Sequence, residues 1–388
     1  MKTDFILLGA VLTLALFGLK FQTYALEFVP SLAPYLLGAV AAAVAAVACA
    51  GGRAGRMLAG RGGWIAWGVA AALMAALLVF GRSYRGGLYL PGRLNPSEVV
   101  KCCMVAFAAS RFCGDRVFPS ASAFLKFAGA FAVVAGETAL AGDFGLLAQL
   151  VLTMAAMLFA ASWFWGVAAF AAVGGGFACV ACTSLGAVGH LGTRFAVWRD
   201  PFVSTDGAGW QTLHGLAAVV NGGMTGLGGE FAEIRKVPIV ESDFAYAGVA
   251  ELWGLLGCLL VLALWATVLL RGLAAGWRRE AEGNRCEALL AAGLVASLGE
   301  QVLLNVAGVL NAFPMTGITL PLVSNGGSSL AVTLVMCGVL LGLARPLPAR
   351  NARKTRRTPS RPRRKRVPDA PPPPPDAPAD EAAGTPTP

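Results

Sequence analysis

The sequence predicts an all-α, polytopic membrane protein with ten transmembrane helices. Of its 388 residues, 56% are hydrophobic and 13% are charged, whereas soluble domains carry about 25% charged residues. Uncharged runs long enough to cross a membrane recur at 28–52, 62–81 and 252–270. Two longer runs, 144–193 and 301–344, must each hold more than one element, because about 20 residues suffice for one span.

The ten expected spans follow one another with short connections, except between the seventh and the eighth. They are placed at 5–24, 33–51, 64–81, 95–112, 122–140, 143–161, 163–186, 244–270, 287–310 and 326–345. The run 144–193 divides near Trp163 and Trp165, because tryptophan favours the membrane–water interface. The run 301–344 divides at 311–329, where prolines and glycines interrupt a regular helix.

The distribution of basic residues predicts that both termini lie in the cytoplasm. With the N-terminus inside, 21 of the 31 Lys and Arg residues fall on the cytoplasmic side, as the positive-inside rule requires. Segment 187–243 is then a large extracytoplasmic loop. The membrane domain covers 1–346, and 347–388 form a basic, Pro-rich cytoplasmic tail that we expect to be disordered.

The basic balance of the chain comes mainly from its C-terminal end. From Arg345 onwards there are eleven Lys or Arg and four Asp or Glu, so this end supplies +7 of the net charge of +10. A basic tail beside a membrane indicates contact with anionic lipid head groups or a cytoplasmic partner. We therefore expect no binding of nucleic acid.

The longest polar interruption, 200–254, is where we expect the chemistry. It contains several glycine pairs and ends with Glu241-Ser242-Asp243, directly before the eighth span. That span carries Glu251 in its first turns. A carboxylate at the end of a transmembrane helix is costly unless it is used or paired.

Further ionisable residues lie inside or beside the expected spans. Glu98 and Lys101 are three residues apart, hence on one helical face where they can pair. Glu137 and Asp143 flank the turn between the fifth and sixth spans, and Glu300 lies in the ninth. A single pair could serve helix packing alone, but several carboxylates near one membrane face favour a polar cavity.

Two outer loops, 82–94 and 194–242, hold basic residues that the positive-inside rule does not explain. Among these are Arg85 and Arg199. They are either ordinary solvated charges or the cationic mouth of a site for an anionic substrate such as a lipid diphosphate, since Arg pairs with phosphate oxygens bidentately.

The last outer turn, 313–330, contains two prolines, several glycines and small hydroxyl residues, with Ser324, Asn325 and Gly326 at its centre. Irregular backbone at membrane depth is tolerated where it is buried in protein or lines a wet cavity. The alternative is a purely structural turn.

This turn carries a family resemblance. Its L-P-L-V-S-N-G-G-S-S-L resembles the L-P-L-V-S-Y-G-G-S-S-L of the SEDS family, which comprises FtsW, RodA and their sporulation homologue SpoVE. Other segments match in the same order, namely Asn95 to Lys101 (family Q-P-S-E-F-x-K), Asp143 to Gly145 (D-L-G), Asp200-Pro201 (D-P), 207–211 (G-A-G-Y-Q), Gly222-Gly223 (G-G), Pro238 to Phe244 (P-E-x-H-T-D-F), and Gln301 with Asn305 in the ninth span. The chain is identified as a divergent member of this family, whose architecture has ten spans.

The resemblance implies a peptidoglycan glycosyltransferase that polymerises lipid II at the outer face of the bacterial cytoplasmic membrane, for cell division or cell shape. Asp243 would be the catalytic general base for the acceptor's GlcNAc 4-hydroxyl, with undecaprenyl diphosphate leaving and inversion at the donor carbon. The residues expected to bind substrate are Lys101, Glu98, Arg85, Glu137, Asp143, Arg199, Glu251, Ser324, Asn325 and Gly326. A divalent cation, Mg²⁺ or Mn²⁺, could help to neutralise the diphosphate, although no ligand cluster in the sequence requires one.

The partners implied are lipid II, a class B penicillin-binding protein, and other membrane proteins of division or elongation. Fourteen residues separate Gly228 from Asp243, a spacing that resembles FtsW more than RodA. The chain departs from the family pattern at Glu241, Ser242 and Asn325, which stand for His, Thr and Tyr.

Two other functions fit the same features. A lipid II flippase would use the polar cavity without needing a base, and a non-catalytic scaffold would use the spans only to dock partners. The retention of Asp243 at its spacing favours the enzyme. A transporter would show inverted repeats, and we find none.

Overall fold

The computed structural model describes residues 3–26, 30–58, 61–84, 87–91, 95–114, 121–162, 166–168, 188–204, 207–228, 237 and 240–346. Its helices are α1 (Phe5–Leu26), α2 (Ala33–Cys49), α3 (Arg53–Leu58), α4 (Arg61–Phe80), α5 (Ser97–Phe112), α6 (Ala121–Leu140), α7 (Phe144–Ala160), α9 (Val188–Arg199), α10 (Ala208–Gly222), α11 (Ala245–Ala281), α12 (Arg285–Val309) and α13 (Gly327–Leu343). Two short 3₁₀ turns, η1 (Ala50–Gly52) and η2 (Pro201–Ser204), and a hairpin of β1 (Arg82–Tyr84) and β2 (Gly87–Tyr89) complete these elements.

The expected helical membrane architecture is confirmed in its main features. Helices occupy nine of the ten expected spans. The seventh expected span, 163–186, lies outside the described residues apart from 166–168, and so does the tail, 347–388. Within the described part, five segments are long and apolar enough to cross a membrane, namely Phe5–Leu26, Ala33–Leu58, Arg61–Phe80, Ala245–Ala281 and Arg285–Val309, and two shorter apolar helices accompany them.

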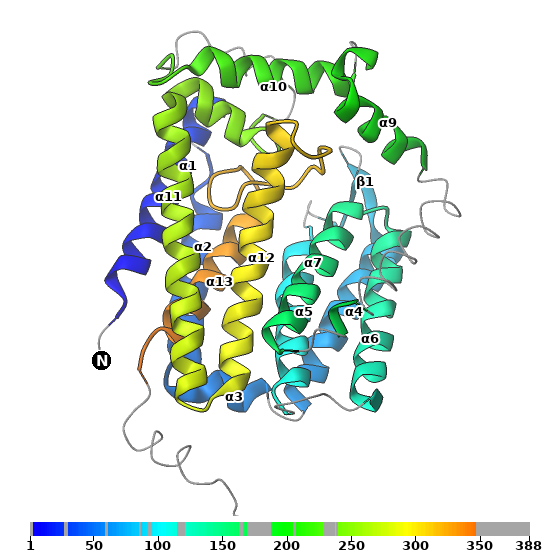
Figure 1. Cartoon of the computed structure of the whole chain (residues 1–388), viewed down its shortest axis with the longest axis vertical. Coiled ribbons are helices and arrows are strands. Elements are labelled where there is room, and N and C mark those ends of the chain that lie inside the picture. Colours follow the sequence, from blue (N-terminus) through cyan, green and yellow to red (C-terminus); the bar gives the residue numbers. More distant parts are fainter. Residues whose placement is uncertain are drawn as a thin grey trace, which may run out of the picture.

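The helices form a bundle with two distinct ends (Figure 1). Helices α9 and α10 lie across one end, which we call the loop end. The opposite end, where α3 lies, we call the tail end. The sequence prediction placed no helix in the outer loop 187–243, so α9 and α10 are an addition to it.

Close helix packing in the bundle depends on small residues. Helices α2 and α13 pack along each other, and a Cβ atom at Gly338 would stand 2.3 Å from the Ala42 carbonyl oxygen. One at Gly342 would stand 2.6 Å from the Ala46 carbonyl oxygen. Small residues let membrane helices approach to backbone contact, where dispersion drives association because lipid offers no hydrophobic gain.

Helix α11 is broken at Gly254, whose φ of +64° lies in the left-handed region. The segment after α10 fills the break: Leu227 N–H donates to the Glu251 carbonyl over 2.8 Å, and Leu255 N–H donates to the Gly223 carbonyl over 2.9 Å. Backbone groups that a broken helix would leave unpaired are thus satisfied. The glycines after α10 therefore lock α10 to the start of α11.

The tail end is held by buried charge. Arg279 and Glu287 are both fully buried, with Nε and Oε2 3.2 Å apart, and the other Glu287 oxygen accepts from Gly55 N–H over 2.9 Å. A disulfide joins Cys113, after α5, to Cys286 at the start of α12. These contacts connect α3, α5, α11 and α12.

Candidate active site

Asp243 lies at the loop end, just before α11, and its backbone is fixed by contacts from distant segments. Ser324 Oγ donates to the Ser242 carbonyl over 2.5 Å, and Asn305 Nδ2 donates to the Asp243 carbonyl over 3.0 Å. Asn325 N–H donates to the Glu241 carbonyl over 2.6 Å. Ser242 Oγ donates to Asp243 Oδ1 over 2.7 Å, which orients the carboxylate.

The segment 310–326, which contains Ser324 and Asn325, is itself held by side chains of α12 and α1 and by its own Ser324. Asn305 Nδ2 also donates to the Ile318 carbonyl over 2.7 Å, and Ser324 Oγ accepts from Leu320 N–H over 2.8 Å. From α1, Gln22 Nε2 donates to the carbonyls of Val323 and Ser324. The irregular backbone expected here is therefore buried in protein and hydrogen-bonded, as membrane depth requires.

A cavity of about 170 Å³ opens beside Asp243. We call it the α9–α10 pocket, and its lining residues are Arg194, Val197, Trp198, Gln211, Thr212, Asp243, Phe244, Asn311, Met315 and Gly317. They come from α9, α10, the segment before α11 and the segment after α12. Together they supply one carboxylate, one guanidinium, two amides and two aromatic rings.

Helix α9 is fastened to the bundle by a reciprocal contact. Trp198 Nε1 donates to the Asn311 carbonyl over 3.1 Å, and Asn311 Nδ2 donates to the Trp198 carbonyl over 3.2 Å. Helical periodicity puts Arg194, Val197 and Trp198 on one face, and this face lines the pocket.

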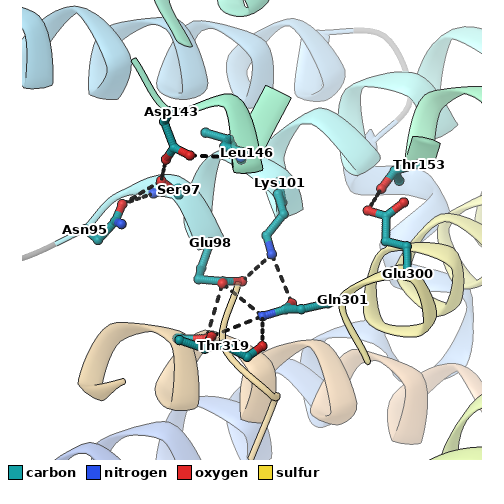
Figure 2. A network of polar contacts seen from close by, with 11 residues as sticks. Asn95, Ser97, Glu98, Lys101, Asp143, Leu146, Thr153, Glu300, Gln301 and Thr319 are labelled. Carbon is teal, nitrogen blue, oxygen red and sulfur yellow. Dashed lines mark hydrogen bonds and ion pairs between the residues drawn. The ribbon is translucent and has the colours of Figure 1, made fainter. Parts of the chain in front are cut away.

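A second polar centre lies between α5, α12 and α13 (Figure 2). Lys101 Nζ is 2.8 Å from Glu98 Oε2 and donates to Gln301 Oε1 over 3.0 Å. Gln301 Nε2 and Ser329 Oγ each donate to Glu98 Oε1 over 3.2 Å. The expected pairing of Glu98 with Lys101 is present, and the pair is buried.

The two polar centres share helix α12 and the segment after it. Gln301 and Asn305 are one helical turn apart on α12; Gln301 also donates to the Thr319 carbonyl, next to the Ile318 carbonyl that Asn305 binds. Glu300, next to Gln301, contacts the Thr153 hydroxyl of α7 instead (Figure 2). The Glu98–Lys101 pair is thus coupled to the position of Asp243 through backbone and amide contacts.

The other residues expected to bind substrate lie apart from the pocket. Asp143 caps α7, accepting from Leu146 N–H over 2.9 Å, and the Ser97 hydroxyl is 2.9 Å from its other oxygen (Figure 2). Glu251 is fully buried beside the break in α11, and Glu137 lies in the last turn of α6.

Ser324, Asn325 and Gly326 act on the backbone in this structure, since the first two hold 241–243 and Gly326 precedes the first turn of α13. Arg85 lies outside the described residues. Arg199 is exposed at the end of α9 and does not line the pocket. Whether any of these residues binds substrate remains a prediction.

Sequence reasoning counted Arg194 only among the basic residues of the outer loops, and it named neither Trp198 nor Asn311 as a site residue. Arg194 and Trp198 are four residues apart and share one face of a helix, but this spacing indicates a common site only once 188–199 is known to be a helix. Asn311 had no signal, because its role depends on contact with a segment 113 residues away.

The described residues do not form a metal centre. Among them, no group of three or more His, Cys, Asp or Glu side chains is arranged to hold a metal ion. The divalent cation expected from the chemistry stays a prediction.

Comparison with known proteins identifies the family. The family model for the cell cycle proteins FtsW, RodA and SpoVE matches residues 66–347. The chain is 31% identical over 285 residues to the probable peptidoglycan glycosyltransferase FtsW of Halomonas elongata, covering 70% of this chain and 71% of that protein. It is 37% identical over 166 residues to the peptidoglycan glycosyltransferase RodA of Mycobacterium tuberculosis, covering 42% and 34% of the two chains.

Solved structures share the fold. A chain from a study of how a peptidoglycan synthase complex coordinates polymerization and crosslinking superposes with a TM-score of 0.71 at 21% identity, covering 92% of this chain and all of that one. The rod shape determining protein RodA of Thermus thermophilus gives a TM-score of 0.61 at 22% identity, covering 89% and 97%. The motifs, the fold and the family match agree, and the chain belongs to the FtsW/RodA/SpoVE family, with a leaning towards FtsW.

Proposed function

We propose that this protein is a peptidoglycan glycosyltransferase that polymerises lipid II into β-1,4-linked glycan strands. Family membership and the names of its relatives support the reaction class. The observation that carries the assignment of the site is the carboxylate of Asp243, which opens onto a cavity while contacts from α12 and 310–326 hold its backbone.

In the proposed reaction Asp243 acts as the general base. The oxygen of the acceptor's GlcNAc 4-hydroxyl forms a bond to C1 of the donor MurNAc, and its proton passes to the Asp243 carboxylate. The bond from C1 to the phosphate oxygen breaks, and undecaprenyl diphosphate leaves with the electron pair. A base must lie within about 3 Å of the oxygen whose proton it takes, and the Ser242 hydroxyl orients the carboxylate for this purpose.

Neutralising the leaving diphosphate requires positive charge. Lys101 is one of the cations expected to neutralise the diphosphate, but the residue is only 1% exposed and its ammonium group is already paired with Glu98. For Lys101 to meet a phosphate, α5 or the segment 318–325 would have to move. Arg199 and Arg85 remain proposed phosphate ligands from the outer loops.

We place the catalytic face outside the cytoplasmic membrane. The ten-span, N-in/C-in orientation puts the loop end, with Asp243, on the outer side and the tail end in the cytoplasm. Lipid II would reach the site from the outer leaflet, and a class B penicillin-binding protein would crosslink the strands. The similarity to a chain of a peptidoglycan synthase complex supports such a partner.

The test is polymerisation of lipid II by the purified chain with its cognate penicillin-binding protein, whose transpeptidase is blocked. Glycan products are read on a gel for wild type and Asp243→Asn. Wild type should form polymer, and the folded variant should form none. Glu280→Gln, an equivalent change at an exposed carboxylate of the tail end, is the matched control and should polymerise normally.

The alternatives give different results. Polymer from Asp243→Asn would remove Asp243 as the base. No polymer from wild type, while it moves lipid II across liposomes, would favour a flippase; neither activity would favour a scaffold.

A further inference from the structure

The acceptor must bind next to the general base, and the α9–α10 pocket is the cavity that lies beside Asp243. Resting on the proposed function, we infer that this pocket is the subsite for the acceptor's terminal N-acetylglucosamine, with Arg194 and Gln211 as its ligands. The attacking hydroxyl must lie within hydrogen-bond distance of the Asp243 carboxylate, and this carboxylate lines the pocket.

The lining of the pocket suits an N-acetylated sugar. A pyranose ring presents C–H groups on its faces and hydroxyl and acetamido groups around its edge. Trp198 and Phe244 offer aromatic surface to the faces, while Gln211 and Asn311 carry amides that both donate and accept hydrogen bonds. Sites of this kind combine apolar walls with a few placed polar groups.

Arg194 is the only guanidinium among the lining residues. With the described residues it forms no hydrogen bond or ion pair, so its five N–H donors are available to a ligand there. Its guanidinium can hold an oxygen of the sugar beside the Asp243 carboxylate.

Gly317 keeps the space between the carboxylate and the guanidinium open. A Cβ atom at this position would stand 3.5 Å from Asp243 Oδ2 and 4.0 Å from Arg194 Nη2. Both charged groups therefore lie close to the position that a side chain at residue 317 would occupy, and glycine leaves that position empty. The φ of +74° also disfavours any other residue here.

Hydrogen bonds fix the wall of the pocket that α9 forms. The reciprocal bonds between Trp198 and Asn311 tie α9 to the end of α12, and this tie sets where Arg194 stands. The donor's C1 must then approach the acceptor oxygen from the side opposite Asp243, outside this pocket. Acceptor and donor affinity should consequently depend on different residues.

The experiment separates the two substrate roles. A lipid II analogue whose GlcNAc 4-hydroxyl is replaced by hydrogen can only donate, and one whose anomeric oxygen is replaced by methylene can only accept. Their coupling by the purified complex gives a single product, so KM is measured for each analogue. Losing a charge-assisted hydrogen bond in Arg194→Ala should raise the acceptor KM about 10- to 100-fold and leave the donor KM unchanged.

Arg194→Lys should recover part of the acceptor affinity, and Gln211→Ala, on a different helix, should raise the acceptor KM independently. Arg199→Ala removes the same charge from α9 outside the pocket and should affect the acceptor KM less than Arg194→Ala. Thermal unfolding of each variant checks that α9 and α10 stay folded.

A rise in the donor KM instead, or no change in either KM for folded Arg194→Ala and Gln211→Ala, would overturn the acceptor subsite while leaving the transferase intact. Absence of coupling by wild type would contradict the proposed function itself.

Discussion

Ser324 joins the two segments that meet at Asp243. Its hydroxyl accepts from Leu320 N–H and donates to the Ser242 carbonyl, so it shapes its own turn and positions the carboxylate at once. The sequence motif predicted a substrate ligand at this position, whereas the structure gives it two backbone partners and buries it to 3% exposure.

Replacing Ser324 by Ala therefore distinguishes positioning from binding. Loss of both hydrogen bonds leaves a buried N–H and a carbonyl unpaired, which costs about 1–3 kcal/mol per group. We expect kcat for lipid II polymerisation to fall about 10- to 100-fold at similar KM. Steady-state kinetics checks this, with Ser324→Thr as the variant that keeps the hydroxyl. A rise in KM at constant kcat would restore the role as a substrate ligand.

For single residues, the sequence shows which positions matter for the site but not which contacts they make. Asp243, Glu98 and Lys101 stand in motifs with recognisable spacing, and the helical period alone predicts that the last two pair. The hydrogen bond from Ser324 to the Ser242 carbonyl joins positions 82 residues apart. Such contacts depend on how α11, α12 and the segment between α12 and α13 pack, which no local pattern encodes.

Among the elements, the spans were predictable and the loop helices were not. A span is visible in composition, because about 20 apolar residues are needed to cross the membrane. Helix α9 has only 12 residues and α10 only 15, lengths at which an isolated helix is marginal in water. Their stability comes from packing on the loop end, where α10 contacts α11.

The break in α11 makes a prediction about Gly254. A Cβ atom there would stand 2.5 Å from backbone atoms of Met224 and Gly226, and the left-handed φ adds strain of about 1–3 kcal/mol. Gly254→Ala should separate α10 from α11, displace Gln211 and Asp243, and lower both thermal stability and polymerisation.

Gly299→Ala is the matched control, because a Cβ there meets only Leu269 at 3.5 Å in ordinary contact. Differential scanning of both variants in detergent, together with the polymerisation assay, gives the comparison. Equal stability of Gly254→Ala and Gly299→Ala would show that the α10–α11 lock is not needed.

For the whole molecule, orientation decides whether the site can work. The proposed N-in/C-in arrangement would put the disulfide between Cys113 and Cys286 at the cytoplasmic end, in a compartment that keeps thiols reduced. The packing of α5 against α12 and the buried Arg279–Glu287 pair must then hold this end without it. In the same proposed arrangement the loop end would face the outer side, where the proposed reaction consumes lipid II.

Two single cysteines test this orientation, one at each end of the bundle. Phe202 is 70% exposed in η2 at the loop end, and Glu280 is exposed at the tail end. A membrane-impermeant maleimide on intact cells should label Phe202→Cys directly and Glu280→Cys only after permeabilisation, with the unsubstituted protein giving the background of native thiols. The reverse pattern would place Asp243 in the cytoplasm. An enzyme so oriented would have to polymerise lipid II before its export, so the labelling result bears on the reaction as well as on the topology.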